Sequence, residues 1–400
     1  MVSFLHTADL HLGMRLTRFD PKTAQKIREA RFQALDNLLR QVGELRVEFV
    51  LIAGDLFDDD AVDLKTAQRA FDILDAATVA VYVLPGNHDP LLPGSVWDRP
   101  PWNQAGRSIH VLRSAEPVEV KAGVWLYPCP LQRKTSLSDP TAWIAAAPAT
   151  TGAVRIGVAH GSLKIRDDLP DDDHLIARDA AAALQLDYLA LGHWHRRLDF
   201  KGSDGIGRTA YAGVHEPMCF QGNTARRTGW VPYGNTRNAD REEFLDSGVG
   251  EALHVTIPVP GQPPHIQPVQ VGQLFWNEER AEVASADDLK RLTTEVATRA
   301  TPERRLLRLK LTGILTADTL VLVDHLREIV EGRYFLGELD TSDLHLQPTD
   351  EALRAAACSG VLRRVLERLQ ADRGNGTPEA QSVAERALMV LYRITQETPS

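Results

Sequence analysis

Residues 79–89 read VAVYVLPGNHD, an apolar run that stops at a cluster of polar side chains. The run Val79–Leu84 is rich in β-branched and aromatic residues, which favours a buried strand, and Pro85 and Gly86 mark a turn behind it. The polar triplet 87–89 therefore follows the carboxyl end of a strand. Because ligands of open α/β sheets bind beyond such strand ends, this stretch predicts both an α/β fold and the position of a site.

Four further apolar runs between residues 2 and 213 end in the same way. Their polar clusters are Asp9-Leu10-His11 after Val2–His6, Gly54-Asp55 after Phe49–Ala53, His160-Gly161 after Arg155–Ala159, and Gly192-His193-Trp194-His195 after Tyr188–Leu191. Residues 22–45 and 64–77 carry apolar positions at helical spacing. Strands that alternate with helices predict a sheet whose strand ends bring the five clusters to one edge.

The remaining sequence predicts two further parts. A polar segment at 214–250 is predicted to be an extended loop, and strands near 252–258 and 265–271 complete the first domain. The pattern then predicts a helix at 286–299, a strand at 305–312, a helix at 317–330, a strand at 334–339, and helices at 350–371 and 378–396. We therefore predict a domain of residues 1–272, a small α+β lobe of residues 273–348, and C-terminal helices of residues 349–400.

The composition is that of an ordinary globular protein, with 43% hydrophobic and 25% charged residues. Three cysteines without CxxC spacing argue against a disulfide framework and for a reducing compartment. The start MVSFLHTADLHLG lacks the features of a signal peptide, and no apolar run suits a membrane span. A cytoplasmic protein is expected. The net charge of −9 is unusual for a protein that binds nucleic acid.

Each polar cluster alone is a weak signal. A DxH or GD sequence commonly forms a turn, and Asn or Asp residues often cap helices. GHxH is more specific, because residues two apart on an extended segment point to the same face. Together, however, the five clusters supply two carboxylates, one amide and several imidazoles. This mixed nitrogen and oxygen set suits two first-row divalent cations with open positions for water and substrate.

The motifs and their order resemble the calcineurin-like metallophosphoesterase superfamily. The resemblance implies a four-layer α/β/β/α sandwich, here with a small α+β C-terminal lobe and terminal helices. One metal would be held by Asp9, His11, Asp55 and His195, and the other by Asp55, Asn87, His160 and His193. Asp55 would bridge the two metals, whereas His88 would remain off both.

This ligand set suits hydrolysis of a phosphate ester. Two cations about 4 Å apart clamp the attacking and leaving oxygens of a phosphoryl displacement and lower the pKa of a shared water. His88 is placed to protonate the leaving oxygen, and Asp89 is predicted to orient that imidazole. Oxygen and imidazole ligands without a thiolate favour Mn²⁺, with Zn²⁺ or Fe²⁺ as alternatives.

Within the superfamily, the chain resembles the SbcD/YhaO-like DNA repair exonucleases. The segments that carry this resemblance are HTADLHLG, AGDLFD, LPGNHD, AHG and LGHWH. This resemblance implies 3′-to-5′ exonuclease and single-strand endonuclease activity on DNA, and an SMC-like ATPase as partner. A homodimer is a further expectation. Asp58 stands where archaeal and eukaryotic relatives place a second histidine. Arg196 and Arg197 are candidate contacts to substrate phosphates, although an exposed strand end explains them equally well.

A nucleotidase or other small-molecule phosphoesterase, or a phosphoprotein phosphatase, fits the metal site as well as a nuclease does. A scaffold protein with a degenerate site is a third interpretation, against which the complete ligand set counts. The region beyond residue 273 favours the nuclease, because the other enzymes do not need it. Its basic residues are candidates for guiding DNA: Arg304, Arg305, Arg308, Lys310 and Arg333.

Overall fold

The computed structural model describes residues 1–104, 106–148, 152–165, 174–220, 250–348, 350–356, 360–375 and 377–397. The chain divides into two compact units, Met1–Trp276 and Asn277–Ser400. The predicted division lies four residues earlier, between residues 272 and 273. Most of the predicted loop at 214–250 lies outside the described residues.

The first unit contains two six-stranded sheets. The first sheet has the order β12-β11-β1-β2-β3-β4, with bounds His265–Gln270, Glu251–Ile257, Val2–Thr7, Phe49–Ala53, Ala80–Leu84 and Ile109–Val111. The second has the order β5-β6-β7-β8-β10-β9, with bounds Val118–Lys121, Val124–Cys129, Val154–His160, Tyr188–Gly192, Gly207–Tyr211 and Leu198–Lys201. Strands β1, β2 and β3 are parallel, as are β6, β7 and β8.

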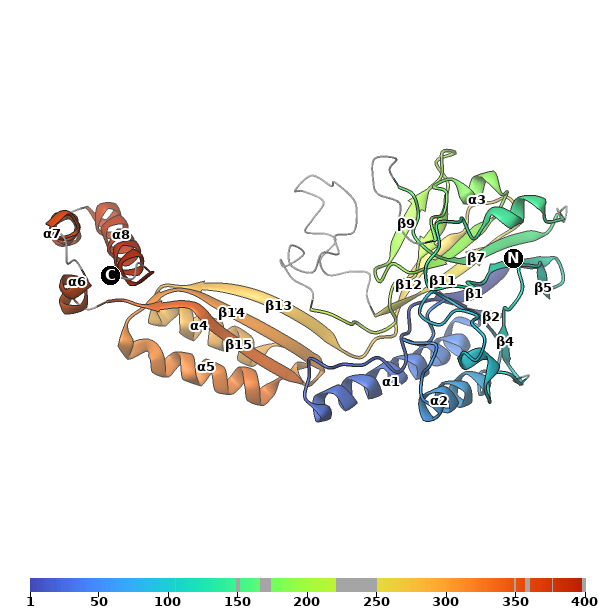
Figure 1. Cartoon of the computed structure of the whole chain (residues 1–400), viewed down its shortest axis with the longest axis horizontal. Coiled ribbons are helices and arrows are strands. Elements are labelled where there is room, and N and C mark those ends of the chain that lie inside the picture. The colour runs from blue at the N-terminus through green and yellow to red at the C-terminus, as the bar shows by residue number, and fades with distance from the viewer. Residues whose placement is uncertain are drawn as a thin grey trace. The chain divides into compact units, whose positions relative to one another are not determined.

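The two sheets pack face to face through apolar side chains. Phe4 of β1 lies edge-on to Tyr188 of β8, with ring centroids 5.7 Å apart, and both belong to one buried cluster that draws on both sheets. Helices α1 (Pro21–Leu45) and α2 (Leu64–Asp75) cover the outer face of the first sheet, and α3 (Ala180–Ala183) packs on the second (Figure 1). The predicted four-layer α/β/β/α sandwich is confirmed.

Helix α1 shows why the sequence pattern was informative. Asp20 accepts hydrogen bonds from the backbone N–H groups of Lys22 and Thr23, at 2.9 and 3.1 Å, and Pro21 occupies the first turn. These are typical signals of a helix start. The helix buries one stripe of side chains against the sheet and ends at Arg46 in a left-handed conformation. Its bounds agree with the predicted span of residues 22–45.

The second unit is built on three strands in the order β13-β14-β15, namely Phe275–Val283, Arg305–Leu315 and Leu336–Leu346. Strands β14 and β15 are parallel, and α4 (Ala286–Thr298) and α5 (Leu320–Arg333) contribute to the same apolar core as these strands. Strand β13 was not predicted from the sequence, and β14 and β15 are longer than the predicted strands at 305–312 and 334–339. Polar residues fill the middle of β13 and the second half of β15, and Thr312-Gly313 interrupts the apolar pattern of β14, so apolar periodicity alone does not reveal the full strands.

Three helices follow: α6 (Asp350–Ala356), α7 (Gly360–Asn375) and α8 (Pro378–Glu397). The single helix predicted at 350–371 is therefore described as two, α6 and α7, and residues 357–359 between them lie outside the described part. Leu353, Leu366 and Leu388 form a small buried cluster within this group. Among the helices described, none combines the length and apolar character needed to cross a membrane.

Candidate metal centre

Two loops of the first sheet form the floor of the site. Asp9 and His11 follow β1, and Asp55 follows β2. Asp9 donates its backbone N–H to the carbonyl of Gly54 at 3.1 Å, and His11 donates to the carbonyl of Asp55 at 3.0 Å. Asp9, His11 and Asp55 have φ angles of 54°, 44° and 52°, which residues other than glycine rarely adopt. Such strain is concentrated at functional sites.

The glycines of the motifs are required by close approach of the site residues. A Cβ atom on Gly54, which has a φ of 95°, would lie 2.1 Å from Nδ1 of His160. A Cβ on Gly86 would lie 2.2 Å from Oδ1 of Asp55. Both separations are far below van der Waals contact, so any larger residue would displace a polar side chain of the site. The GD and GNH motifs therefore need glycine for steric reasons.

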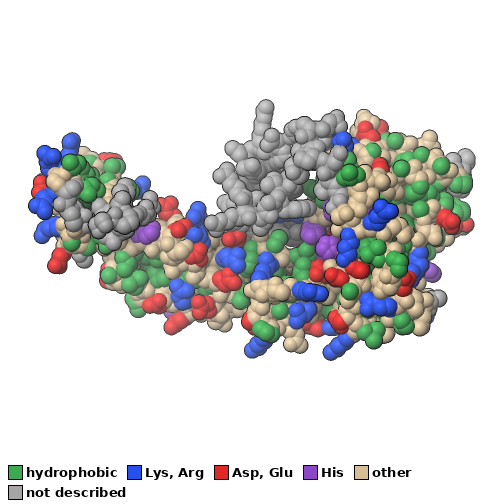
Figure 2. All heavy atoms as spheres, viewed as in Figure 1, with side chains coloured by type: hydrophobic (Ala, Val, Ile, Leu, Met, Phe, Trp, Pro, Cys, Tyr) green, Lys and Arg blue, Asp and Glu red, His purple; other side chains and the backbone are tan. Residues whose placement is uncertain are grey.

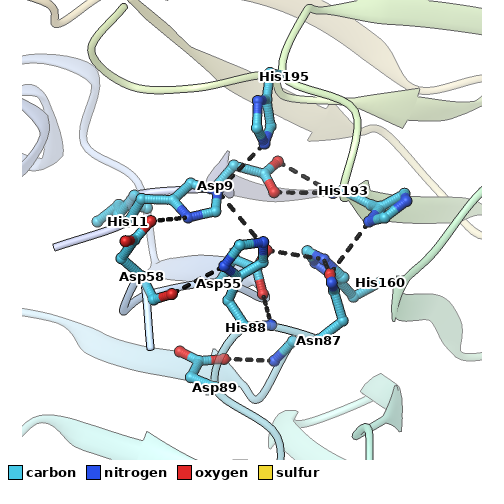
Figure 3. A network of polar contacts seen from close by, with 12 residues as sticks. Asp9, His11, Asp55, Asp58, Asn87, His88, Asp89, His160, His193 and His195 are labelled. Atoms are coloured by element: carbon cyan, nitrogen blue, oxygen red, sulfur yellow. Dashed lines mark hydrogen bonds and ion pairs between the residues drawn. The ribbon is translucent and has the colours of Figure 1, made fainter. Parts of the chain in front are cut away.

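The first ligand cluster consists of Asp9, His11, Asp55 and His195. The Nε2 atoms of His11 and His195 lie 3.2 Å apart, and Nε2 of His11 is 3.7 Å from Oδ2 of Asp55. Donor atoms of Asp9, His11 and His195 all lie within 4.8 Å of one another. These groups come from β1, β2 and the end of β8, so both sheets contribute to the cluster (Figure 3).

The second ligand cluster consists of Asp55, Asn87, His160 and His193. Oδ1 of Asn87 lies 2.7 Å from Nε2 of His160 and 3.2 Å from Nδ1 of His193. Nε2 of His160 is also 3.3 Å from Oδ2 of Asp55. The other ring nitrogen of His160 donates to the carbonyl of Ala53 at 2.9 Å, which leaves Nε2 directed at the cluster. Asp55 belongs to both clusters.

The spacing of these atoms fits bound cations. A cation with ligand bonds of roughly 2.1 Å separates neighbouring ligand atoms by roughly 3 Å, and the distances above range from 2.7 to 3.7 Å. Carboxylate, amide and imidazole groups without a thiolate suit divalent first-row metals. The structure thus brings together all seven residues that the sequence predicted as metal ligands.

His88 lies beside the clusters and is partly exposed. Its backbone N–H donates to Oδ1 of Asp55 at 2.9 Å, and its ring Nδ1 lies 2.9 Å from the carbonyl oxygen of Asp58. A carbonyl only accepts, so Nδ1 carries the hydrogen and Nε2 is the atom available to a substrate. Figure 2 shows histidine side chains gathered on this face of the first unit, with acidic and basic side chains around them.

Residues 2–197 match the family model described as "Calcineurin-like phosphoesterase". This part of the chain is therefore similar to calcineurin-like phosphoesterases, and we call the first unit, Met1–Trp276, the phosphoesterase domain. This family and the two ligand clusters imply divalent metal ions.

Three curated relatives of the phosphoesterase domain are informative. "Uncharacterized metallophosphoesterase YhaO" of Bacillus subtilis is 27% identical over 238 residues, which are 56% of this chain and 54% of that protein. "DNA double-strand break repair protein Mre11" of Methanocaldococcus jannaschii is 26% identical over 221 residues, 53% of this chain and 56% of that protein. The Mre11 protein of Aeropyrum pernix is 33% identical over 92 residues, 22% and 21% of the two chains. The chain spans about half the length of the first two relatives.

The phosphoesterase domain buries its ligands and thereby shifts their pKa values. Burial raises the pKa of Asp9 to about 6. Burial alone would also raise the pKa of Asp55, but the nearby imidazoles, His160 foremost, hold it below its ordinary value. Conversely, burial alone would lower the pKa of His160, and the carboxylates of Asp55 and Asp9 raise it to about 9. A divalent cation would replace the positive charge that the imidazolium supplies.

The predicted role of Asp89 requires a correction. Its buried carboxylate accepts hydrogen bonds from the backbone N–H groups of Phe57, at 2.9 Å, and Gly86, at 2.7 Å. It therefore fastens the GNHD loop to the GDLFD loop, whereas the ring of His88 contacts the carbonyl oxygen of Asp58. The two backbone donors hold the carboxylate of Asp89, and the carbonyl of Asp58 orients the imidazole of His88 instead.

Asp58 belongs to the site, although it was not among the predicted site residues. Its carbonyl accepts from the ring of His88 at 2.9 Å, and its Oδ1 lies 3.2 Å from Nδ1 of His11. This contact directs Nε2 of His11 to the first ligand cluster, as carboxylates behind metal-binding histidines commonly do. The sequence feature that could have indicated this role is the position of Asp58 three residues after Asp55, in GDLFD.

The two predicted phosphate contacts differ. Arg197 lies 3.3 Å from the carboxylate of Glu251, at the start of β11, so its charge is already compensated. Arg196 is partly buried, and burial lowers its pKa. Arg197 therefore has a structural contact that the sequence did not indicate, because Glu251 lies 54 positions further along the chain than Arg197.

Proposed function

We propose that this chain is a two-metal phosphodiesterase that cuts DNA. The observation that carries the phosphodiesterase is the pair of ligand clusters that share Asp55, with His88 beside them. The choice of DNA is supported by the similarity to two archaeal Mre11 proteins, whose names describe double-strand break repair. The SbcD/YhaO-like branch, with Mn²⁺ as the preferred metal, is part of the same proposal.

The residues of the chain perform distinct tasks in this reaction. Cations in the two clusters would polarise a phosphoryl oxygen and make a water acidic enough to ionise at neutral pH. Asp55 holds the clusters together, and the strained turn at Asp9 and His11 fixes their donor atoms before substrate arrives. His88, as an imidazolium, would keep one proton on Nδ1, donated to the carbonyl of Asp58, and give the second proton, on Nε2, to the oxygen that leaves phosphorus.

A partner is proposed from the C-terminal helices. Val361 of α7 and Val383 of α8 are 63% and 67% exposed, and Val365 and Val390 are 42% and 49% exposed. Apolar side chains at helical spacing suit docking of another helix, and an SMC-like ATPase supplies helices in a coiled coil. Mixing the chain with that ATPase should shift its elution volume, and Val361→Glu should abolish the shift. A homodimer dissolved by the same substitution would instead identify a second copy as the partner.

One observation favours the alternative, a nucleotidase or other small-molecule phosphoesterase. Arg308 lies 2.7 Å from Glu338, and Lys310 lies 2.9 Å from Asp343. These strand cations were predicted to guide DNA, yet their charges are already compensated by acidic side chains. The net charge of −9 points the same way.

The two functions are separated by substrate choice. The full chain should be incubated with Mn²⁺ and labelled single- and double-stranded DNA, beside bis(p-nitrophenyl) phosphate and a nucleoside monophosphate. We expect metal-dependent DNA cleavage that weakens as salt rises, because phosphate contacts release counterions. His88→Ala serves as the inactive control. Strong release of phosphate from the nucleotide, without DNA cleavage, would establish the alternative.

A further inference from the structure

A buried arginine lies directly behind the first ligand cluster. Arg31 belongs to α1 and is only 1% exposed. Its Nε and Nη2 atoms donate to the carbonyl oxygen of Leu10, at 3.1 and 2.5 Å. Leu10 is the residue between Asp9 and His11, so the guanidinium holds the turn that presents two of the four ligands of the first cluster.

This turn needs an external partner. Asp9 and His11 both have positive φ angles, a conformation that side chains disfavour and that persists only where the surroundings enforce it. The carbonyl of Leu10 points away from the ligands into the protein, where an unpaired acceptor is costly. Arg31 satisfies this acceptor with two N–H groups and thereby favours the strained turn over alternative conformations.

The same guanidinium is anchored on a second segment. Nη1 of Arg31 donates to the carbonyl of Glu216 at 3.2 Å, and Nε2 of His215 donates to the carbonyl of Arg31 at 2.9 Å. The neighbouring Val214 donates its backbone N–H to the carbonyl of His195 at 3.1 Å. The segment 214–216 thus contacts both the Leu10 turn, through Arg31, and the loop that carries His195.

Glu216 is itself held by residues 273–274, near the end of the phosphoesterase domain. Its carboxylate accepts from the backbone N–H groups of Gln273 and Leu274, at 2.5 and 2.9 Å. Burial lowers the pKa of Arg31 to about 10, while Glu216 and Asp58 offset the effect. Arg31 therefore remains charged at neutral pH. We call Arg31, His215 and Glu216 the arginine brace.

The arginine brace acts most directly on one ligand cluster. Its contacts lead to Asp9, His11 and His195, which belong to the first cluster. It reaches the second cluster less directly, through Asp9, whose carboxylate accepts from the backbone N–H of His193 at 3.0 Å and lies near Asp55 and His160. The carbonyl of Ala53 holds His160 from behind. We propose that Arg31 is a positioning residue for the metal of the first ligand cluster. This proposal rests on the two-metal function proposed above.

The type of side chain matters for this role. Arginine presents its N–H groups in a rigid fork, so one side chain reaches the carbonyls of Leu10 and Glu216 together. Lysine keeps the charge but has a single nitrogen. Arg31→Lys should therefore retain part of the function, whereas Arg31→Met, which has similar length and no donor, should lose it.

The test measures metal binding rather than activity. Equilibrium dialysis with Mn²⁺ should be performed on the metal-free full chain and its variants, well below their melting temperatures. Arg31→Met should weaken one of two sites by roughly 10- to 100-fold, the range for partners behind metal ligands, and weaken the other less, because Asp9 also contacts the second cluster. Arg31→Lys should show a smaller loss at the same site. Leu38→Ala, a fully buried position on the same helix, should lower the melting temperature without changing either affinity.

Several results would overturn the proposal. Two wild-type affinities in Arg31→Met, or equal weakening in Leu38→Ala, would show that Arg31 only stabilises the fold. If Arg31→Met does not fold, wild-type affinities in Arg31→Lys would have the same meaning. Wild-type chain that binds fewer than two Mn²⁺ ions would instead contradict the proposed two-metal function, so the two failures are distinguishable.

Discussion

Two regions of the molecule use charged and polar side chains differently. One is the edge of the phosphoesterase domain that carries the two ligand clusters, here called the ligand edge. The other is the face of β14 and β15 that carries Arg308 and Lys310. On the strands, each cation has an acidic partner: Arg308 pairs with Glu338, and Lys310 with Asp343. At the ligand edge, donor atoms of like chemistry face one another, such as the Nε2 atoms of His11 and His195 at 3.2 Å. The first arrangement is complete in itself, whereas the second is completed by a cation.

The backbone shows the same contrast. Asp9, His11 and Asp55 are held in strained conformations by hydrogen bonds between loops. Strands β14 and β15 pair in parallel over most of their length, with one register shift. Strain maintained by neighbouring groups, together with converging donor atoms, separates a site from a charged surface more reliably than residue type alone.

The largest effect should follow from loss of the shared ligand. Asp55→Asn removes charge from both clusters, and phosphodiester hydrolysis should fall roughly 1,000-fold or more, because a metal ion contributes several kcal/mol to the transition state. Asp63→Asn is the matched control, since Asp63 caps α2 by accepting from Thr66 at 2.9 Å. The measurement is the initial rate of bis(p-nitrophenyl) phosphate hydrolysis by each variant. Similar rates for both variants would place Asp55 outside the chemistry.

His88 should separate proton transfer from metal binding. His88→Ala should lower turnover roughly 100-fold or more, the usual range for a lost proton donor, while metal content stays at the wild-type value. His110→Ala, an exposed histidine of β4, should change neither. The measurements are turnover and elemental analysis of the same samples. A loss of metal from His88→Ala would make that residue a ligand.

Protonation of His160 should oppose metal binding. The raised pKa of His160, about 9 against an ordinary 6.5, stabilises the metal-free fold fully below pH 6.5, and this stabilisation is lost as pH rises through 9. The melting temperature of the metal-free chain should therefore fall between pH 6.5 and 9. Mn²⁺ affinity should rise over the same interval, by up to about tenfold per pH unit. Thermal scans with and without a chelator test the expected melting temperatures, and dialysis with Mn²⁺ tests the expected affinities. An Mn²⁺ affinity that falls as pH rises would contradict the role of His160 as a metal ligand.

The smallest effect belongs to the strand face. Arg308→Gln and Lys310→Gln remove partly exposed ion pairs, which contribute little to stability, so the melting temperature and the hydrolysis of bis(p-nitrophenyl) phosphate should hardly change. Cleavage of DNA should change little as well, because both charges are compensated. A large loss of DNA cleavage alone would show that these cations exchange their partners for phosphates, and would break the contrast between the two surfaces.

Much of the fold of the phosphoesterase domain could be predicted, because its apolar runs in sequence are also its buried strands in the structure. Apolar runs such as Phe49–Ala53 are buried strands, and the polar residues behind them meet because parallel strands end at one edge. The second unit was harder to predict, since β13 contains the consecutive polar residues 277–280 and so lacks the apolar pattern of a strand. The orienting contact of His88 could not be predicted, because sequence neighbours suggest Asp89, whereas the fold brings in the backbone of Asp58.

The contacts of the arginine brace could not be predicted from the sequence either. Arg31 lies in the stripe of α1 that faces the sheet, where a charged residue breaks the apolar pattern without indicating its partner. Its acceptors, the carbonyls of Leu10 and Glu216, are backbone groups far away in sequence. Backbone acceptors leave no trace in residue type, so only the folded chain reveals them.

The central claim is that the two ligand clusters each hold a cation. Titration of Mn²⁺ into the metal-free wild-type chain by isothermal calorimetry tests it most directly, with elemental analysis of the product as a check on stoichiometry. We expect two ions per chain, and loss or weakening of both in Asp55→Asn, because Asp55 belongs to both clusters. A single tightly held ion that Asp55→Asn leaves unchanged would contradict it.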